Sequence, residues 1–96
     1  MLLQIVEANY LGNCRFGISF NDGKFGTADF KKLSLEEPKE VFSRFKDEAF
    51  VSQGRLEHGT LLWPGDIDLA PEYIYYTTFS NQPEFHDTFV KWGYCS

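Results

Sequence analysis

The chain has 96 residues, a formal net charge of -5 and 18% aromatic residues. This length suits one domain with a modest hydrophobic core and leaves no room for a second. The charge is uneven, because residues 49–96 hold two Lys or Arg against six Asp or Glu, and an acidic surface repels phosphate backbones. Direct nucleic-acid binding is therefore not expected, although Lys31, Lys32 and Lys39 form a local basic patch.

The N-terminus and the cysteines indicate the compartment. The first residues carry no basic segment before an apolar run, and no stretch approaches the roughly 18 apolar residues of a membrane span. Cys14 and Cys95 are far apart and share no metal-ligand spacing. We therefore expect a cytoplasmic protein with two free thiols, and a disulfide between them is the less favoured alternative.

Three strands are predicted in the first third of the chain. Apolar and polar residues alternate from Val6 to Tyr10, with Val6 facing inward, and alternate more clearly from Cys14 to Phe20. The Asp-Gly pair at 22–23 is typical of a hairpin turn, so residues 24–30 should return antiparallel to the second strand. These segments predict an N-terminal three-stranded meander.

One helix is predicted in the centre of the chain. Residues 31–37 suggest a polar connector, and Pro38 suits the first position of a helix because its missing N–H is not needed there. Val41, Phe42 and Phe45 share one face at helical spacing, which predicts a helix of about ten residues that packs on the sheet.

Further short strands follow this helix. Residues 50–51 suggest one strand and residues 55–63 a longer one, in which Gly59 marks a bulge or a close backbone approach. Pro64 and Gly65 form a turn, and a short extended piece follows at residues 66–69.

Helical segments are expected in the C-terminal third. Residues 73–79 have the aromatic and β-branched content of a strand, but Pro71 opens a helical turn and we favour helix. Apolar residues at 85, 89 and 92 predict a short amphipathic helix that ends at Gly93. The order of elements predicts an α+β fold, with a domain at residues 1–78 and a helical tail at residues 79–96.

Several of these segments resemble, in order, the family numbered 2442 among the domains of unknown function (DUF2442). The resemblance covers residues 3–78 and is carried by Phe20-Asn21-Asp22-Gly23, by Asp29-Phe30, and by the run from Leu62-Trp63-Pro64-Gly65 to Pro71-Glu72. The run departs from the family pattern in lacking a residue between the Pro and the Gly, so we expect a tighter turn.

The resemblance implies a small α+β domain of mainly bacterial and phage-like proteins, without established biochemistry. Some members carry a helix-turn-helix after the domain, and some are encoded beside toxin-like partners. Only 17 residues follow Phe79, too few for two helices and a turn, so we do not expect the DNA-binding role of the fused members.

No catalytic, cofactor or metal site is expected. Asp66, Asp68 and Glu72 could form a carboxylate cluster, but Ala70 and Pro71 occupy the positions of a ligand and of the Gly in a calcium loop. His58 and His86 share no ligand spacing with each other or with the cysteines.

Excess aromatic residues beside acidic ones instead suggest a surface for another protein, because Trp and Tyr are enriched at interface hot spots. The candidate partner-binding residues are Trp63, Asp66, Asp68, Glu72, Tyr73, Tyr76, Phe85, Phe89 and Trp92. Core packing of the same rings is the simpler alternative.

We expect a non-enzymatic protein-interaction or accessory domain, antitoxin-like, whose partner is another copy or a basic protein. Two alternatives remain open at this stage. One is a small-ligand or metal-binding enzyme that uses Asp66, Asp68 and Glu72, and the other is a homodimer joined through a sheet edge or the tail helix.

Overall fold

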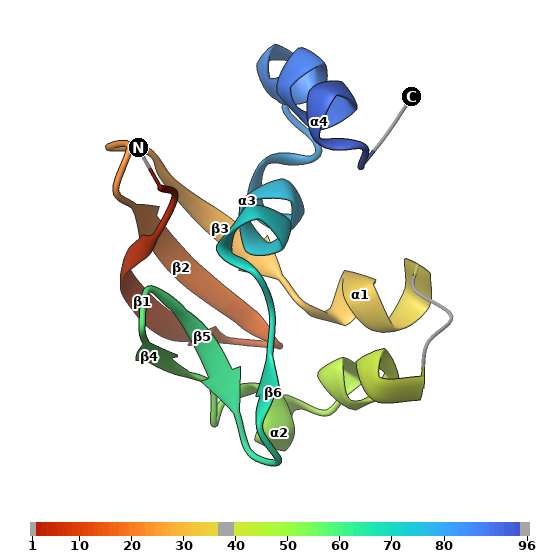
Figure 1. Ribbon diagram of the computed structural model, residues 1–96. Helices are drawn as coiled ribbons and strands as arrows, with labels where there is room; N and C mark the ends of the chain where they lie inside the picture. Colours follow the sequence, from red (N-terminus) through yellow and green to blue (C-terminus); the bar gives the residue numbers. More distant parts are fainter. Residues whose placement is uncertain (1, 37–39, 95–96) are drawn as a thin grey trace.

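The computed structural model describes residues 2–36 and 40–94 and has the predicted α+β fold, with two antiparallel sheets and several short helices (Figure 1). The first sheet has the order β1-β2-β3 and the second the order β4-β5-β6. Their strands are β1 (Ile5–Gly12), β2 (Arg15–Phe20), β3 (Phe25–Asp29), β4 (Arg55–Glu57), β5 (Thr60–Trp63) and β6 (Ile67–Asp68).

The first sheet confirms the predicted N-terminal meander. Inward residues of β2 are buried. The loop from Asn21 to Lys24 joins β2 to β3, and within it only Gly23 has a left-handed φ, 86°. The prediction that Val6 faces inward is wrong. A register shift between Ile5 and Glu7 turns Ile5 into the core and leaves Val6 56% exposed.

Three short helical segments cover the region where one helix was predicted. They are α1 (Lys31–Glu36), the 3₁₀-helix η1 (Glu40–Lys46) and α2 (Glu48–Val51). The predictions of a polar connector at residues 31–37 and of a strand at residues 50–51 are therefore wrong. Pro38, Lys39 and the side chain of Val41 lie outside the part of the chain that the structure describes. Asp47 caps α2 by accepting a hydrogen bond from the backbone N–H of Ala49, at 3.0 Å, which favours helix over strand.

The second sheet differs from the prediction at one turn. Residues 55–63 form a hairpin instead of one strand, because His58 and Gly59 both take left-handed φ values, 53° and 80°. Gly59 does make a close approach, since its carbonyl accepts a hydrogen bond from the N–H of Ile5 at 2.8 Å and so joins the two sheets. The extended piece near residues 66–69 is confirmed as β6, which pairs with β5.

The helices expected in the C-terminal third are present. They are α3 (Pro71–Phe79), a short 3₁₀ turn η2 (Pro83–Phe85) and α4 (His86–Trp92), which ends at Gly93 as predicted. The tail docks on its own domain, because Phe85 and Phe89 pack on Tyr75, with ring centroids 5.7 and 6.2 Å apart. No helix in the described ranges is long and apolar enough to cross a membrane.

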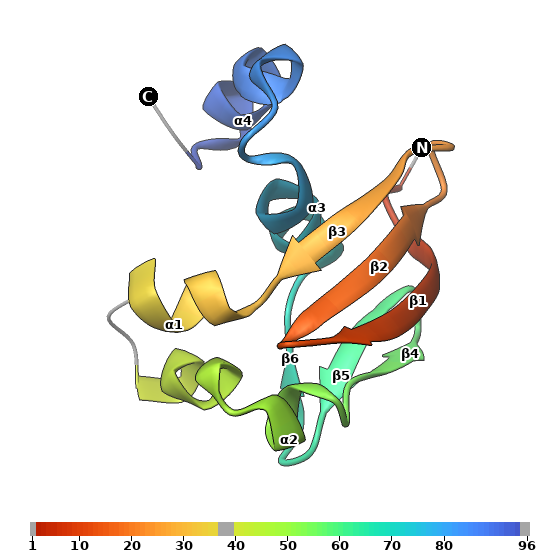
Figure 2. The same ribbon diagram turned by 180° about the vertical axis from the view of Figure 1, so that it is seen from behind.

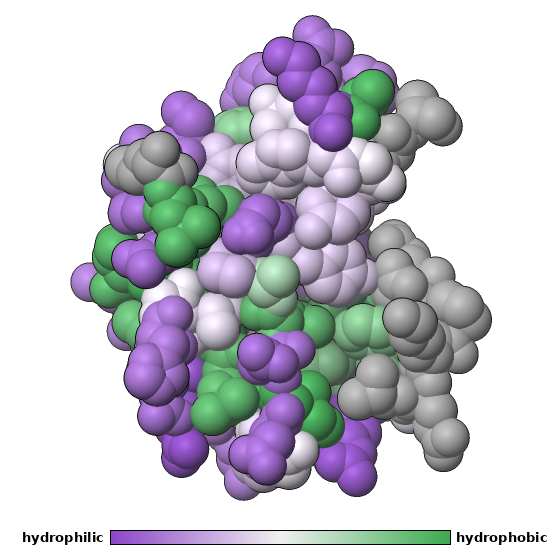
Figure 3. Space-filling model, in the orientation of Figure 1, coloured by the Kyte–Doolittle hydropathy of each residue, from purple (hydrophilic) through white to green (hydrophobic). Residues whose placement is uncertain are grey.

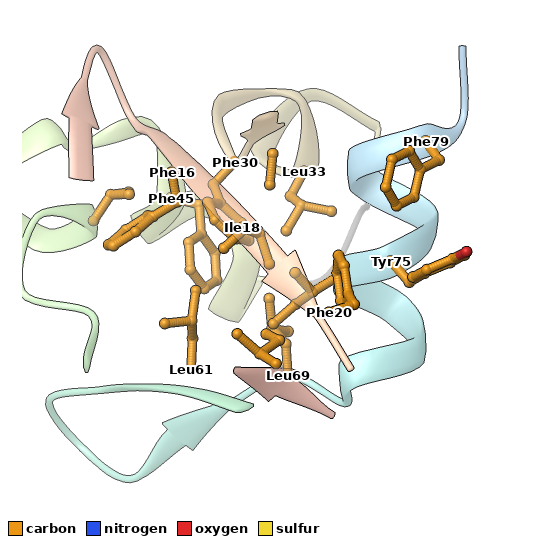
Figure 4. Packing of buried hydrophobic residues seen from close by; sticks show 14 of the residues in the cluster. Phe16, Ile18, Phe20, Phe30, Leu33, Phe45, Leu61, Leu69, Tyr75 and Phe79 are labelled. Atoms are coloured by element: carbon orange, nitrogen blue, oxygen red, sulfur yellow. The ribbon is translucent and has the colours of Figure 1, made fainter. Parts of the chain in front are cut away.

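The core lies between the first sheet, the second sheet and the helices (Figure 4). Trp63 is near its centre, 2% exposed, with ring contacts to Phe16, Phe30 and Phe45 and a hydrogen bond from Nε1 to the carbonyl of Val51 at 3.0 Å. Contacts between rings extend from this centre through α3 into the tail. Such ring packing explains how a small chain holds two sheets and a tail together.

The expected free thiol at Cys14 is confirmed, and this residue is 2% exposed. It lies in the turn after β1 with a φ of 61° and not in the following strand. Burial raises the pKa of its thiol, and the negative charge of Glu48 adds to the rise. Cys95 lies outside the described residues.

Candidate partner-binding site

The helix α3 presents aromatic side chains on two sides. One side carries Ile74, Tyr75 and Phe79, which are buried against the first sheet and the tail. The other carries Tyr73 and Tyr76, which are half-buried. Because both sides are rich in rings, periodicity alone could not separate helix from strand here.

The end of α4 brings one more tyrosine to this second side. Gly93 has a left-handed φ of 83°, and the N–H of Tyr94 donates to the carbonyl of Phe89 at 2.9 Å while that of Gly93 reaches Val90. This is a Schellman motif, which turns the chain back after a helix. It places Tyr94 over α3, with its ring centroid 5.0 Å from that of Tyr76.

A continuous row of partly exposed rings results, which we call the aromatic strip. It consists of Phe42, Tyr73, Tyr76, Tyr94 and Trp92, and it runs from η1 across α3 to the end of α4. Neighbouring centroids are 6.1, 6.4, 5.0 and 6.2 Å apart in that order. In Figure 3, weakly polar side chains gather over the region of α3.

A small pocket of about 100 Å³ lies in the middle of the strip. Its lining is Lys32, Leu33, Tyr73, Tyr76, Thr77, Ser80 and Tyr94. Burial raises the pKa of Tyr94, and the negative charge of Glu72 adds to the rise. Cofactor sites usually have volumes of about 300 Å³ or more, so a pocket of this size suits one side chain of a partner.

The structure brings only some of the predicted partner-binding residues together. Tyr73, Tyr76 and Trp92 belong to the aromatic strip, and Glu72 lies near Tyr94. Trp63, Phe85 and Phe89 are instead core residues, 2%, 8% and 2% exposed. These three rings hold the fold together, and a partner cannot reach them in this conformation.

The carboxylates of Asp66 and Asp68 lie away from the strip. Asp66 is in the turn between β5 and β6, at the opposite end of the molecule from α4, and Asp68 follows in β6 (Figure 1). In the described part of the chain, no three His, Cys, Asp or Glu side chains are grouped so that they could hold a metal ion. The position of Asp66 at a φ of 59° is typical of a turn residue.

A comparison with models of known protein families identifies the family of the chain. The model of one family, described as a protein of unknown function (DUF2442), matches residues 5–80. The chain belongs to the DUF2442 family. No curated protein and no solved structure matches it.

The matched region divides the aromatic strip. Phe42, Tyr73 and Tyr76 lie within the DUF2442 match, while Trp92 and Tyr94 lie in the tail that follows it. The strip is thus built where the tail docks on the DUF2442 domain. Sequence reasoning missed Tyr94 as a site residue, although an aromatic residue directly after a helix-ending Gly is the signal of this motif.

Proposed function

We propose that this DUF2442 protein is a non-enzymatic protein-interaction module that binds its partner through the aromatic strip. The observation that carries the proposal is the row of five partly exposed rings, with Trp92 40% exposed at one end. Tyr and Trp are the side chains that most often dominate the energy of protein interfaces, because they bury a large area at a low cost in side-chain entropy. The small pocket between them accepts one side chain of the partner.

The charge of the chain supports a basic partner. Glu72 lies beside the strip, and the second half of the chain, which contributes most of the strip, holds six acidic residues against two basic ones. The side chains of Arg and Lys also bind to the faces of aromatic rings, so the strip and its charge favour the same class of partner. An accessory factor of the cytoplasm that covers a basic protein, as an antitoxin does, fits both properties.

Co-purification from the native host tests this proposal. A tagged chain should retain a stoichiometric protein, and Trp92→Ala should weaken its capture by about 30-fold, the effect of losing an interface hot spot. Val90→Ala is the matched control, because Val90 is 41% exposed on the same helix but outside the strip. Circular dichroism should show that both variants are folded.

Two results would count against the proposal. One is equal capture by the two variants. The other is a tagged protein that stays monomeric and retains no stoichiometric partner.

Capture of the partner should also weaken as salt is added, because salt screens charges on an exposed surface.

A further inference from the structure

The tail is held on the domain by few buried side chains. Of the tail residues that the structure describes, 83–94, only Phe85 and Phe89 are buried, and the connector at residues 80–82 is exposed. Figure 2 shows α4 at one end of the molecule, beyond α3. Because ordering each residue costs conformational entropy, a segment held by two buried rings opens more easily than the core.

The helix α4 depends on this docking. It has seven residues, and helices shorter than about 12 residues are not stable alone in water. The Schellman motif that places Tyr94 over α3 is formed by the last turn of the same helix. Undocking of the tail therefore unfolds α4 and removes Trp92 and Tyr94 from the aromatic strip together.

Tyr75 on α3 contacts three rings of the tail. Its ring centroid is 5.7 Å from that of Phe85, 6.2 Å from that of Phe89 and 5.6 Å from that of Trp92. The hydroxyl of Tyr75 donates a hydrogen bond to Oδ2 of Asp22 at 2.9 Å, and Asp22 lies in the loop between β2 and β3. This loop thus keeps the ring of Tyr75 in the position on which the tail packs.

The same loop also contacts the tail directly. Nζ of Lys24 lies over the ring of Phe85, 5.9 Å from its centroid, and a cation is attracted to the face of a ring. The backbone N–H of Lys24 donates to Oδ1 of Asp22 at 3.0 Å, so one carboxylate orders both the turn at Lys24 and the ring of Tyr75. Lys24 is not part of the aromatic strip, and it acts on the strip only through the tail.

We propose that the tail is a conditional half of the aromatic strip, which exchanges between a docked and an unfolded state, and that Lys24 favours the docked state. Only the docked state offers a partner all five rings of the strip. Partner binding and the contact of Lys24 favour the same state, so each strengthens the other. The exchange of the tail stands on its own contacts, whereas its effect on a partner rests on the proposed function.

Amide hydrogen exchange of the free protein tests the opening of the tail. The amides of residues 90–94 should exchange about tenfold faster than those at the centre of β2, or faster still. Their exchange should depend little on added urea, because opening the tail exposes little surface.

Substitutions at Lys24 test its part in the opening. Lys24→Gln should speed exchange at residues 90–94 by about 2- to 5-fold, the loss of an exposed contact between a cation and a ring. Lys24→Arg keeps the cation and should restore the wild-type rate. Lys46→Gln removes the same charge from η1 and is the matched control, with no effect expected. In a Phe85→Leu background, which lacks the ring, Lys24→Gln should have no effect either.

The protein that co-purifies with the wild-type chain tests the effect on the partner. Phe89→Ala removes one of the two buried rings and should increase the undocked population, which amide exchange measures. Capture of the co-purified protein should fall in proportion to the docked fraction, although Phe89 itself is out of reach of a partner.

Two results in the free protein would overturn the proposal. One is exchange at residues 90–94 that is as slow as in β2 and has the same urea dependence, because the tail would then open only with the whole domain. The other is equal exchange in Lys24→Gln and Lys46→Gln.

The capture experiment separates this proposal from the proposed function. If Phe89→Ala undocks the tail without loss of capture while Trp92→Ala weakens capture, the effect of docking on the partner is overturned and the proposed function stands. If neither substitution weakens capture, the proposed function fails, and amide exchange alone decides whether the tail opens.

Discussion

Replacing Gly54 by Ala should test how tightly the centre of the core is packed. A Cβ at this position would lie 2.6 Å from Nε1, 2.8 Å from Cε2 and 3.1 Å from Cζ2 of Trp63, all three too close. Overpacking costs about 1–3 kcal/mol, and moving the indole also weakens its hydrogen bond to Val51, worth about 1 kcal/mol more. We therefore expect Gly54→Ala to lower the free energy of unfolding by about 2–4 kcal/mol and the Tm by roughly 10–20 °C.

A double-mutant cycle with Trp63→Phe identifies the cause. A phenyl ring lacks the indole nitrogen and the fused ring that obstruct the new Cβ. Trp63→Phe alone should cost about 2 kcal/mol, because it removes the hydrogen bond from Nε1 to the carbonyl of Val51, which keeps only the N–H of Gly54 as a donor, and because it leaves a space where the fused ring was packed. In that background Gly54→Ala should cost little, and urea unfolding followed by circular dichroism measures all four chains. A coupling energy below about 0.5 kcal/mol would refute the packing that we describe.

Two further predictions concern α3 and the tail. Burial and the hydrogen bond that Tyr75 donates to Asp22, at 2.9 Å, raise the pKa of Tyr75, so the folded state holds this proton more tightly than the unfolded chain. The free energy of unfolding should therefore fall as the pH rises above about 10, and urea titrations should show a less steep fall for Tyr75→Phe. Phe89→Ala should destabilise the chain by about 3 kcal/mol in the same assay, because Phe89 is 2% exposed and joins the tail to α3. Val90→Ala, on the exposed side of α4, should change stability by no more than about 0.5 kcal/mol, and equal effects of the two substitutions would show that the tail is not docked.

The strands of the first sheet could be predicted because one face is buried and the other is not. Phe16, Ile18 and Phe20 alternate with Arg15 and other outward residues, and burial follows the same period. Val6 departs from this alternation because a bulge shifts the register by one residue, and the pattern of apolar and polar residues does not show where a bulge lies.

The short helices could not be predicted from periodicity. One turn of helix, such as α2, has too few residues to show a period of 3.6, so local hydrogen bonds decide it. Asp47 before Glu48 was the available signal, since a helix-capping residue followed by an acid is typical of a helix start. The hairpin within residues 55–63 was missed because a His-Gly pair allows a left-handed turn but does not require one, and here both residues adopt it.

The candidate site could be predicted in part. Tyr73 and Tyr76 are close in sequence, so a helix was enough to bring them to one side. Trp63 was wrongly predicted as a surface residue, because the sequence around a ring at the end of a strand does not show which side of that strand the helices cover. Predicting Tyr94 as a site residue would have required knowledge of how the tail folds back onto α3, which depends on contacts between residues distant in sequence.

The different surroundings of the two tryptophans make the chain a fluorescence sensor of its own unfolding. Trp63 is sealed in the core, whereas Trp92 is 40% exposed on the tail. Emission from Trp63 should therefore follow the loss of the whole core, and emission from Trp92 should follow release of the tail. In single-tryptophan variants, a separation between the two signals would reveal a state in which the tail has left α3 while the domain stays folded.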